Sequence, residues 1–453
     1  YYFNKLLDDN KNLILTFLSF WFILIISSFT SEDYFLSFKN IGFYFRFLTF
    51  SLLILYCLNN YKKLNYIILY VYFILLCIIL LSSIYEALTG INFFSNTPTL
   101  QGRITSIFLD EQILGSFIVK SLPLILGLLY FTKIRYKLLI ILSLISISSI
   151  LIFFSGERTA LALFLILIFL SLKIKDLRKV FYFLIIIFLS ISVIFPKVFS
   201  FKQLNLKRLY AHTLMQAGIS SLGKDERIRI FSPTHEYHYI SGLKMFLDNP
   251  VLGIGPNNFR KECKQDKYFV KKIPFQATKI SAIDDGYFLG LIGNYFYFGI
   301  NDKRFLRSKF EINPNYELLN KGKILKIRQY DGSIIIEKHF KKGDHIFNYL
   351  QETNISGCNT HPHNYVVQFL SETGVLGFIF YISLIFFLVY KIVLIFFSKN
   401  YENFSEYFLL ISIFLSLFPL LPSGNFFNNM NSFIIFWNLP FYIYFRNLSN
   451  FTK

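Results

Sequence analysis

The chain has 453 residues, of which 54% are hydrophobic and only 16% are charged, whereas a soluble domain carries about 25% charged residues. This composition and a mean hydropathy of +0.49 exclude an ordinary soluble protein. The formal net charge of +19 would suggest a nucleic-acid partner in a soluble protein. Here Lys and Arg collect in short loops between apolar segments, so we expect no nucleic-acid partner.

About ten apolar segments are long enough to cross a hydrocarbon core of roughly 30 Å as helices. The first lacks a cleavage site of small residues, so we interpret it as an anchor rather than a signal peptide. The chain begins with Tyr1 rather than Met, which leaves open whether its natural start lies upstream. The predicted spans are residues 12–30, 41–59, 65–84, 113–132, 136–154, 158–173, 179–197, 376–397, 405–421 and 430–446.

Lysine and arginine fill alternate loops of this pattern, around residues 62–63, 133–137 and 173–179. Because cytoplasmic loops carry the excess of these residues, we predict that these loops and both termini lie inside. The polar segments then all face outside. They are residues 103–111, 155–158, 198–360 and 422–427.

The sequence therefore predicts an all-α polytopic membrane protein with a large mixed α/β loop domain between helices seven and eight. A bundle of seven helices would occupy residues 1–197, the loop domain residues 198–364, and a bundle of three helices residues 365–453. Within the loop domain, Asp331-Gly332 between two β-prone runs predicts a hairpin. The apolar segment from Asp285 is short and rich in glycine. We interpret it as buried or interfacial, because a span there would move residues 358–364 to the cytoplasmic side.

The stretch CNTHPHNYVVQFLSETGVLGF, residues 358–378, puts polar residues before an apolar helix. Pro362 disfavours helix at His361 and is tolerated in a first turn, so His363 and Asn364 are expected at a helix start. Unpaired backbone N–H groups there favour anions, and a neutral imidazole can act as a general base. The alternative is an Asn cap with capping histidines.

Two features follow on that helix. Glu372 lies nine residues after His363, about half a turn out of phase, so we do not expect it to orient the imidazole. Gly374 and Gly377 are expected to let the helix bend.

The segment GLKMFLDNPVLGIGPNNFR ends at Arg260 and contains a turn with two glycines, Gly253 and Gly255. Such turns can hold phosphate oxygens, and the alternative is a simple helix stop.

Arginine is the characteristic cation of the outer segments, and its guanidinium matches phosphate oxygens bidentately. Arg158 follows Ser155-Gly156-Glu157 at the mouth of a span. The alternatives for it are an interfacial anchor and an ion pair with Glu157. The further candidates are Arg103, Arg227 and Arg229.

Metal and cofactor signals are weak. His235 and His238 are three residues apart and could hold zinc together with His361 and His363. No HExxH or carboxylate-rich motif accompanies them, so we predict no metal. No Walker loop or dinucleotide fingerprint occurs, and we predict no cofactor. Cys263 and Cys358 both fall in the outer stretch, where an oxidising compartment permits a disulfide.

Taken together, these motifs resemble those of the O-antigen ligase and O-antigen polymerase superfamily of bacterial membrane glycosyltransferases. The ligase pattern of His, then Asn, Ser or Gln, nine residues and Gly-x-x-Gly is matched by His363, Asn364, Gly374 and Gly377. DNPVLGIGPNNF and FSGERTALALF are similar to further family segments, and the resemblance runs from roughly residue 100 to 440. The family's Arg-x-x-x-Trp is not matched, because Phe231 follows Arg227 at that spacing. The choice between Arg227 and Arg229 as the second arginine therefore stays open.

The resemblance implies a metal-independent, inverting transfer at the periplasmic face of the bacterial inner membrane. The donor would be a glycan on undecaprenyl diphosphate. The acceptor would be a lipid A–core sugar for a ligase, or another carrier-linked glycan for a polymerase. A transporter is less favoured, because we find no inverted repeats and no mid-membrane charges. The implied catalytic residues are His363, Arg158, Arg227 and Arg229, and the implied substrate-binding residues are Arg103, His361, Asn364, Gly253, Gly255, Arg260 and Glu372.

Overall fold

The computed structural model describes residues 7–61, 63–97, 103–109, 111–132, 134–178, 231, 233–274 and 357–451, and strand segments between residues 281 and 355. The helices of the first part are α2 (Lys11–Ser28), α3 (Tyr34–Tyr44), α4 (Arg46–Asn60), α5 (Leu64–Thr89), η2 (Ser106–Phe108), α6 (Leu114–Phe131), α7 (Lys137–Ser155) and α8 (Arg158–Ser171). Those of the second part are α11 (Pro233–Asp248), α12 (Phe259–Glu262), η3 (Asp266–Tyr268), α13 (Tyr365–Phe397), α14 (Phe404–Ser416) and α15 (Asn429–Phe451).

The helical class of the protein is confirmed, but the predicted number of spans is not reached in the described part of the chain. Six helical segments there are long and apolar enough to cross a membrane: α2, α3 with α4, α5, α6, α7 and α13. The predicted spans 158–173 and 405–421 correspond to α8 and α14, which are shorter apolar helices of 14 and 13 residues. The predicted span 179–197 lies outside the described residues.

Local sequence explains two of these differences. α14 ends at Ser416, shortly before Pro419, which has no N–H group and disfavours helix at the residue before it. The predicted span 430–446 corresponds to α15, which is long enough but contains Pro440 and several polar residues. An apolar run of sufficient length therefore does not guarantee a helix of the same length.

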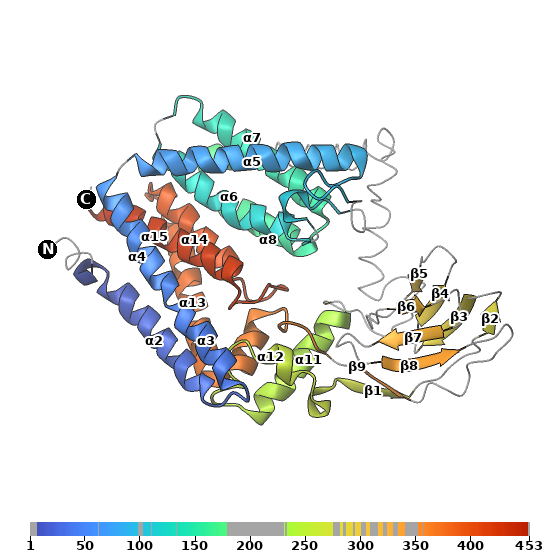
Figure 1. Ribbon diagram of the computed structural model, residues 1–453. Coiled ribbons are helices and arrows are strands. Elements are labelled where there is room, and N and C mark those ends of the chain that lie inside the picture. The colour runs from blue at the N-terminus through green and yellow to red at the C-terminus, as the bar shows by residue number, and fades with distance from the viewer. Residues whose placement is uncertain are drawn as a thin grey trace.

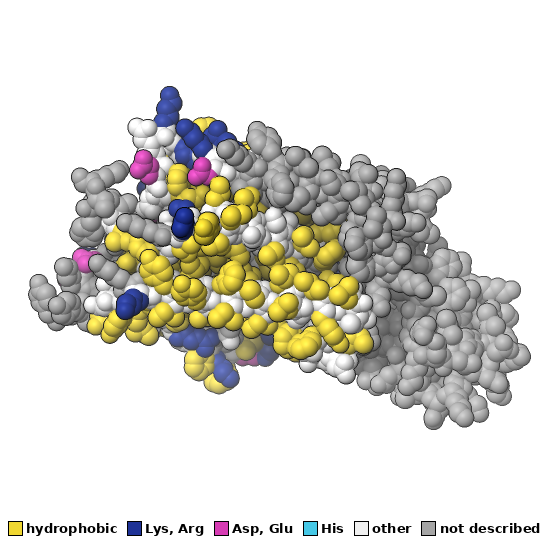
Figure 2. Space-filling model, turned by 90° about the horizontal axis from the view of Figure 1, so that it is seen from above, with side chains coloured by type: hydrophobic (Ala, Val, Ile, Leu, Met, Phe, Trp, Pro, Cys, Tyr) yellow, Lys and Arg dark blue, Asp and Glu magenta, His cyan; other side chains and the backbone are white. Residues whose placement is uncertain are grey.

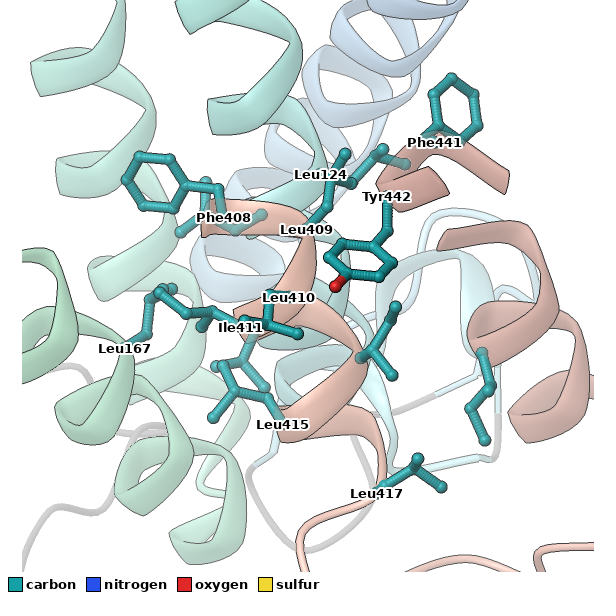
Figure 3. Close-up of a cluster of buried hydrophobic side chains, with 14 of the residues drawn as sticks. Leu124, Leu167, Phe408, Leu409, Leu410, Ile411, Leu415, Leu417, Phe441 and Tyr442 are labelled. Carbon is teal, nitrogen blue, oxygen red and sulfur yellow. The ribbon is translucent and has the colours of Figure 1, made fainter. Parts of the chain in front are cut away.

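Helices of the two predicted bundles pack against each other. α14 packs against α6 and α15, α15 against α4, and α13 against α2. Figure 3 shows a core formed by this packing, where fully buried side chains of α6, α8, α14 and α15 meet, among them Leu124, Leu167, Leu410 and Phe441. Because lipid tails are as apolar as leucine, this core stabilises the bundle through close packing rather than removal from water.

The surface over α5 is apolar, as expected for contact with lipid. Figure 2 shows a nearly continuous hydrophobic face on this side, with Lys and Arg toward its margins. The exposed apolar residues of α5 include Ile67, Tyr70, Val71, Phe73, Ile74, Ile78, Leu81, Ile84 and Leu88. The start of α2 and the end of α15 lie at one end of the bundle, and α11, α12 and the strands lie beyond the other end (Figure 1).

The segment between α12 and α13 contains antiparallel strands. They are β1 (Lys271–Pro274), β2 (Ser281–Ile283), β3 (Tyr287–Ile292), β4 (Tyr295–Gly299), β5 (Phe305–Ser308), β6 (Tyr316–Leu319), β7 (Ile324–Arg328), β8 (Ile334–His339) and β9 (Glu352–Ile355). They pair in the orders β1-β9, β2-β3-β4-β5 and β6-β7-β8.

Two predictions for this segment can be compared with the strands. β7 and β8 pair antiparallel on either side of Asp331-Gly332, as the hairpin signal predicted, and the turn itself lies outside the described residues. The apolar segment from Asp285 forms β3 and β4, which pair with each other. It is therefore a strand pair and not a spanning helix, which agrees with the prediction that it does not cross the membrane.

Candidate active site

The histidine motif leads into α13 through an asparagine cap. Asn364 has extended backbone (φ −154°, ψ 131°), and its side-chain oxygen accepts a hydrogen bond from the N–H of Val367 at 3.2 Å. Its amide nitrogen donates to the carbonyl of Pro419 at 3.0 Å. The predicted cap is thus confirmed, and it also ties the start of α13 to the loop after α14.

α13 is broken at Gly374, where φ is +64° and ψ is −163°. The backbone groups that the break releases find partners in the segment after α11. The N–H of Val375 donates to the carbonyl of Pro250 at 2.8 Å, and the N–H of Ile254 donates to the carbonyl of Ser371 at 2.9 Å. The bend predicted at Gly374 is therefore confirmed, and it is the docking point of the glycine turn.

The two glycines of that turn lie against protein. A Cβ at Gly253 would lie 2.5 Å from the backbone of Glu372, and one at Gly255 would lie 2.6 Å from Cβ of Ser31. The hydroxyl of Thr30 donates to the carbonyl of Gly253 at 2.7 Å. These contacts favour the tight-turn interpretation over a backbone nest for phosphate.

Glu372 is fully buried and joins α12 to α13. Its carboxylate accepts hydrogen bonds from the N–H of Phe259, at the start of α12, at 3.2 Å and from the amide of Gln368 at 3.0 Å. A carboxylate near the first N–H groups of a helix is stabilised by them. The structure thus gives Glu372 an architectural position between α12 and α13.

A chain of amide side chains continues from this carboxylate to Arg260. Gln368 donates to Asn425 Oδ1 at 2.7 Å, and Asn425 donates to Asn257 Oδ1 at 3.0 Å. Arg260 Nη2 donates to the same Asn257 oxygen at 2.9 Å. This network holds the guanidinium of Arg260, which is close enough to lower the pKa of His361 through its charge.

Four histidine rings gather where α11 meets the loop before α13. His363 lies at the centre, with ring-centroid distances of 4.0 Å to His361, 5.2 Å to His238 and 5.5 Å to His235. His238 and His361 are buried. This arrangement could not be predicted from the sequence. The pair His235 and His238 is more than a hundred residues from the pair His361 and His363, and the packing of α11 on α13 brings the two pairs together.

The loop after α14 forms hydrogen bonds with the two histidines of the motif, His361 and His363. His363 has a left-handed backbone with φ +55°, a conformation that costs a non-glycine residue about 1–2 kcal/mol. Its carbonyl accepts from the N–H of Ser423 at 2.9 Å, and His361 Nε2 lies 3.2 Å from the carbonyl of Ser423. Strained residues of this kind concentrate at functional sites.

Burial keeps both motif histidines neutral. It lowers the pKa of His363 to about 2, and the neighbouring rings of His361, His238 and His235 lower it further in their charged forms. Burial likewise lowers the pKa of His361 to about 4, against a hydrogen bond with the Ser423 carbonyl that raises it. Each ring therefore carries a lone pair at neutral pH, as a general base requires.

The histidine cluster does not form a metal site in the part of the chain that the structure describes. No group of three or more His, Cys, Asp or Glu side chains there is placed to hold a metal ion. The ring nitrogens of His361 lie within hydrogen-bond distance of Thr360 Oγ1 and the Ser423 carbonyl. Both ring nitrogens of His361 therefore have partners within the protein.

Cys263 and Cys358 form a disulfide across a sequence separation of 95 residues. Cys263 is buried in a small core with Met245, Ile254, Phe259 and Tyr268. The bond ties the end of α12 to the first residue of the histidine motif. It therefore fixes the two ends of the strand-containing segment beside the cluster.

The arginine candidates on the first part of the chain lie around the start of α6. Glu157 accepts from the N–H groups of Gly115 at 2.5 Å and Ser116 at 3.1 Å. Burial raises the pKa of Glu157, while these bonds and the charge of Arg103 oppose the shift. Arg103 donates to Gln112 at 2.6 Å. Arg158 is exposed as the first residue of α8, and Arg227 and Arg229 lie outside the described residues.

Lys120 is an ionisable residue that the sequence analysis did not single out. It is only 9% exposed within α6, and its ammonium lies 3.5 Å from Asn431 Oδ1. Asn431 in turn donates to the carbonyl of Asn425 at 3.0 Å. The sequence feature that could have identified Lys120 is that it is a single lysine inside an apolar run. Ionisable residues in membrane spans are commonly functional. Lys120 thus connects α6 to the loop that clamps the histidines.

Comparison with known proteins finds one protein family that part of this chain matches. Residues 124–293 match the family described as O-antigen ligase. The matched region includes α7, α8, α11 and the glycine turn and ends before the histidine motif. No curated protein and no solved structure matches the chain significantly. The match over residues 124–293 confirms the predicted resemblance to the O-antigen ligase and polymerase superfamily. The described residues also contain six helical segments that are long and apolar enough to cross a membrane.

Proposed function

We propose that the protein is an O-antigen ligase-type enzyme that moves a glycan from undecaprenyl diphosphate to a lipid A–core sugar. The observation that carries the proposal is the neutral His363 at the start of α13, held in a left-handed backbone among three other histidines. The same donor chemistry with a carrier-linked acceptor would make it a polymerase. The His-Asn and Gly-x-x-Gly spacing at residues 363–377 favours the ligase.

The proposed reaction is one inverting displacement. The acceptor hydroxyl oxygen attacks the anomeric carbon, its proton passes to His363, and the bond from that carbon to the diphosphate oxygen breaks. Undecaprenyl diphosphate leaves with the electron pair. Nothing in this balance requires a metal or a cofactor, so we expect the transfer to be independent of both.

Arginines would stabilise the charge that develops on the leaving diphosphate, which is often the largest catalytic contribution. Among the described arginines, Arg260 is the candidate whose charge acts on His361. Arg158 and Arg103 are the candidates at the mouth of α8 and α6, and Arg227 and Arg229 are further ones. Asn364 and His361 complete the proposed binding residues.

Donor binding would also activate the base. An opposite charge within about 4–6 Å raises the pKa of an imidazole, and the diphosphate brings such a charge toward a ring whose pKa is otherwise far below neutral. We therefore propose that the donor binds first and prepares His363 to accept the proton. The site would face the periplasm from the inner membrane, at the end of the bundle opposite the start of α2 and the end of α15.

The test is reconstitution of the purified protein in lipid vesicles with undecaprenyl diphosphate-linked glycan and either of two acceptors. We expect transfer to lipid A–core and loss of transfer in His363→Ala, with unchanged protein level. Asn40→Ala is the control, because the amide of Asn40 donates a hydrogen bond to the carbonyl of Leu36 within its own helix, α3. Transfer to the carrier-linked acceptor alone would identify a polymerase. Full activity of His363→Ala would refute the base, and chelator inhibition would refute metal independence.

A further inference from the structure

The side chain of Asn359 lies between two histidine rings. Its amide nitrogen is 2.8 Å from His363 Nε2 and 3.4 Å from His238 Nε2. Its amide oxygen accepts from the N–H of Thr360 at 2.7 Å. A backbone N–H can only donate, so the atom that faces it is the oxygen and the atom that faces the histidines is the NH₂ group.

This orientation determines where the histidines carry their protons. An amide NH₂ group only donates hydrogen bonds, so His363 Nε2 must accept with its lone pair, and the ring proton of the neutral imidazole sits on Nδ1. His238 gives an independent check. Its Nδ1 lies 2.8 Å from the carbonyl of Gly357, which only accepts, so His238 also carries its proton on Nδ1 and presents the lone pair of Nε2.

We propose that Asn359 is a positioning residue that fixes this tautomer in His363 and His238, so that both Nε2 lone pairs face one point. The proposal rests on the proposed function, in which His363 accepts a proton from a sugar hydroxyl. The N–H of Asn359 occupies the place that the acceptor O–H takes at Nε2. The acceptor therefore displaces this hydrogen bond and meets a lone pair already directed toward it.

Hydrogen bonding to the neutral form of a base disfavours its protonation. Asn359 therefore adds to the effects of burial in keeping His363 unprotonated before the acceptor arrives. The other titratable or charged groups that face this ring, among the described residues, are His235 and His238 from α11, His361 from the same loop, and Arg260 beside His361. None of them is a carboxylate, so a carboxylate placed at position 359 should dominate the titration.

The experiment measures the reaction of His363 with diethyl pyrocarbonate, which modifies unprotonated imidazole nitrogens, by mass spectrometry across pH. It uses the full-length protein in detergent and needs no transfer activity. In Asn359→Ala the Nε2 lone pair is uncovered, and we expect modification about fivefold faster at neutral pH, the factor that corresponds to a hydrogen bond of about 1 kcal/mol. In Asn359→Asp we expect the titration midpoint of His363 to rise by at least about one pH unit.

The acid limb of glycan transfer should move upward in the same order, further in Asn359→Asp than in Asn359→Ala. Asn40→Ala and Asn40→Asp, on α3, are the matched controls and should change neither quantity. An unchanged modification rate in Asn359→Ala, or a uniform loss of transfer with an unchanged midpoint, would overturn the proposal. If Asn359→Asp does not accumulate, the Asn359→Ala rate decides. Absence of transfer in the wild type would refute the proposed function alone.

Discussion

Substitution of Gly374 by alanine should push the glycine turn that follows α11 away from its contact with α13. The residue has φ +64° and ψ −163°, a region that is essentially restricted to glycine and costs other residues about 1–3 kcal/mol. A Cβ there would lie 2.6 Å from the N of Leu252, and the carbonyl of Val251 would be closer still. The glycine turn would therefore have to move away from α13.

Such a move would also weaken the hydrogen bonds that the turn makes to Val375 and Ser371. At about 1 kcal/mol for each bond, together with the backbone cost, Gly374→Ala should destabilise the protein by roughly 4 kcal/mol. The matched control is Gly42→Ala in α3, where nothing lies within 4 Å of the added Cβ. Alanine is favoured over glycine in a helix by about 1 kcal/mol, so the same chemical change should be neutral or stabilising there.

The assay is thermal unfolding of the detergent-purified variants, combined with limited proteolysis of the segment around residues 249–258. We expect a clearly lower melting temperature and faster cleavage for Gly374→Ala, and neither for Gly42→Ala. Transfer activity should fall with the first variant, because Arg260 follows the turn. A melting temperature for Gly374→Ala equal to the wild-type value would refute the reasoning that the break in α13 anchors the turn.

Three further predictions concern charge, covalent tethering and pH. Arg158→Lys should slow transfer in vesicles about 10–100-fold, because lysine loses one charge-assisted hydrogen bond to the diphosphate; a rate within twofold of wild type would contradict this. Replacing Cys263 and Cys358 by serine should lower stability by about 2–4 kcal/mol, measured by thermal unfolding, and dithiothreitol should have the same effect on the wild type only. Because the pKa of His361 is lowered to about 4 in the folded protein, its contribution is complete above the unfolded pKa of about 6.5 and is lost as pH falls toward 4. His361→Gln should therefore flatten the melting temperature between pH 6.5 and 4, and an unchanged slope would contradict the shift.

The sequence predicted the helical class well because apolar runs report directly on helices that face lipid. It predicted helix ends less well. The run at 405–421 is apolar to its end, yet α14 stops at Ser416 ahead of Pro419. The break at Tyr44–Arg46 between α3 and α4 contains no glycine or proline, and the nearby Gly42 lies within α3. These ends depend on loop contacts that a one-dimensional pattern does not contain.

Local features of the site could be predicted from sequence motifs, but contacts between residues far apart in the sequence could not. Asn364 caps α13 as its position before an apolar run predicted. His238 and Asn359 could not be assigned together, because they are 121 residues apart in sequence and meet only after α11 packs on α13. The sequence analysis did not single out Lys120, which is buried in α6.

The glycine turn and the Gly-x-x-Gly pattern, treated as separate motifs in the sequence, are the two halves of one contact. Gly374 breaks α13 about 14 Å along the helix from Tyr365. Because this position is buried, the backbone groups that the break releases need hydrogen-bond partners from other parts of the protein. Pro250 and Ile254 supply those groups. The turn must therefore be apolar enough to enter the bundle, which explains the residues PVLGIGP, and its position sets α12 and Arg260 beside the histidines. A change at either glycine motif should consequently be felt at the other, and the pair Gly374→Ala with Gly253→Ala should cost less than the sum of the two single changes, since each disrupts the same contact.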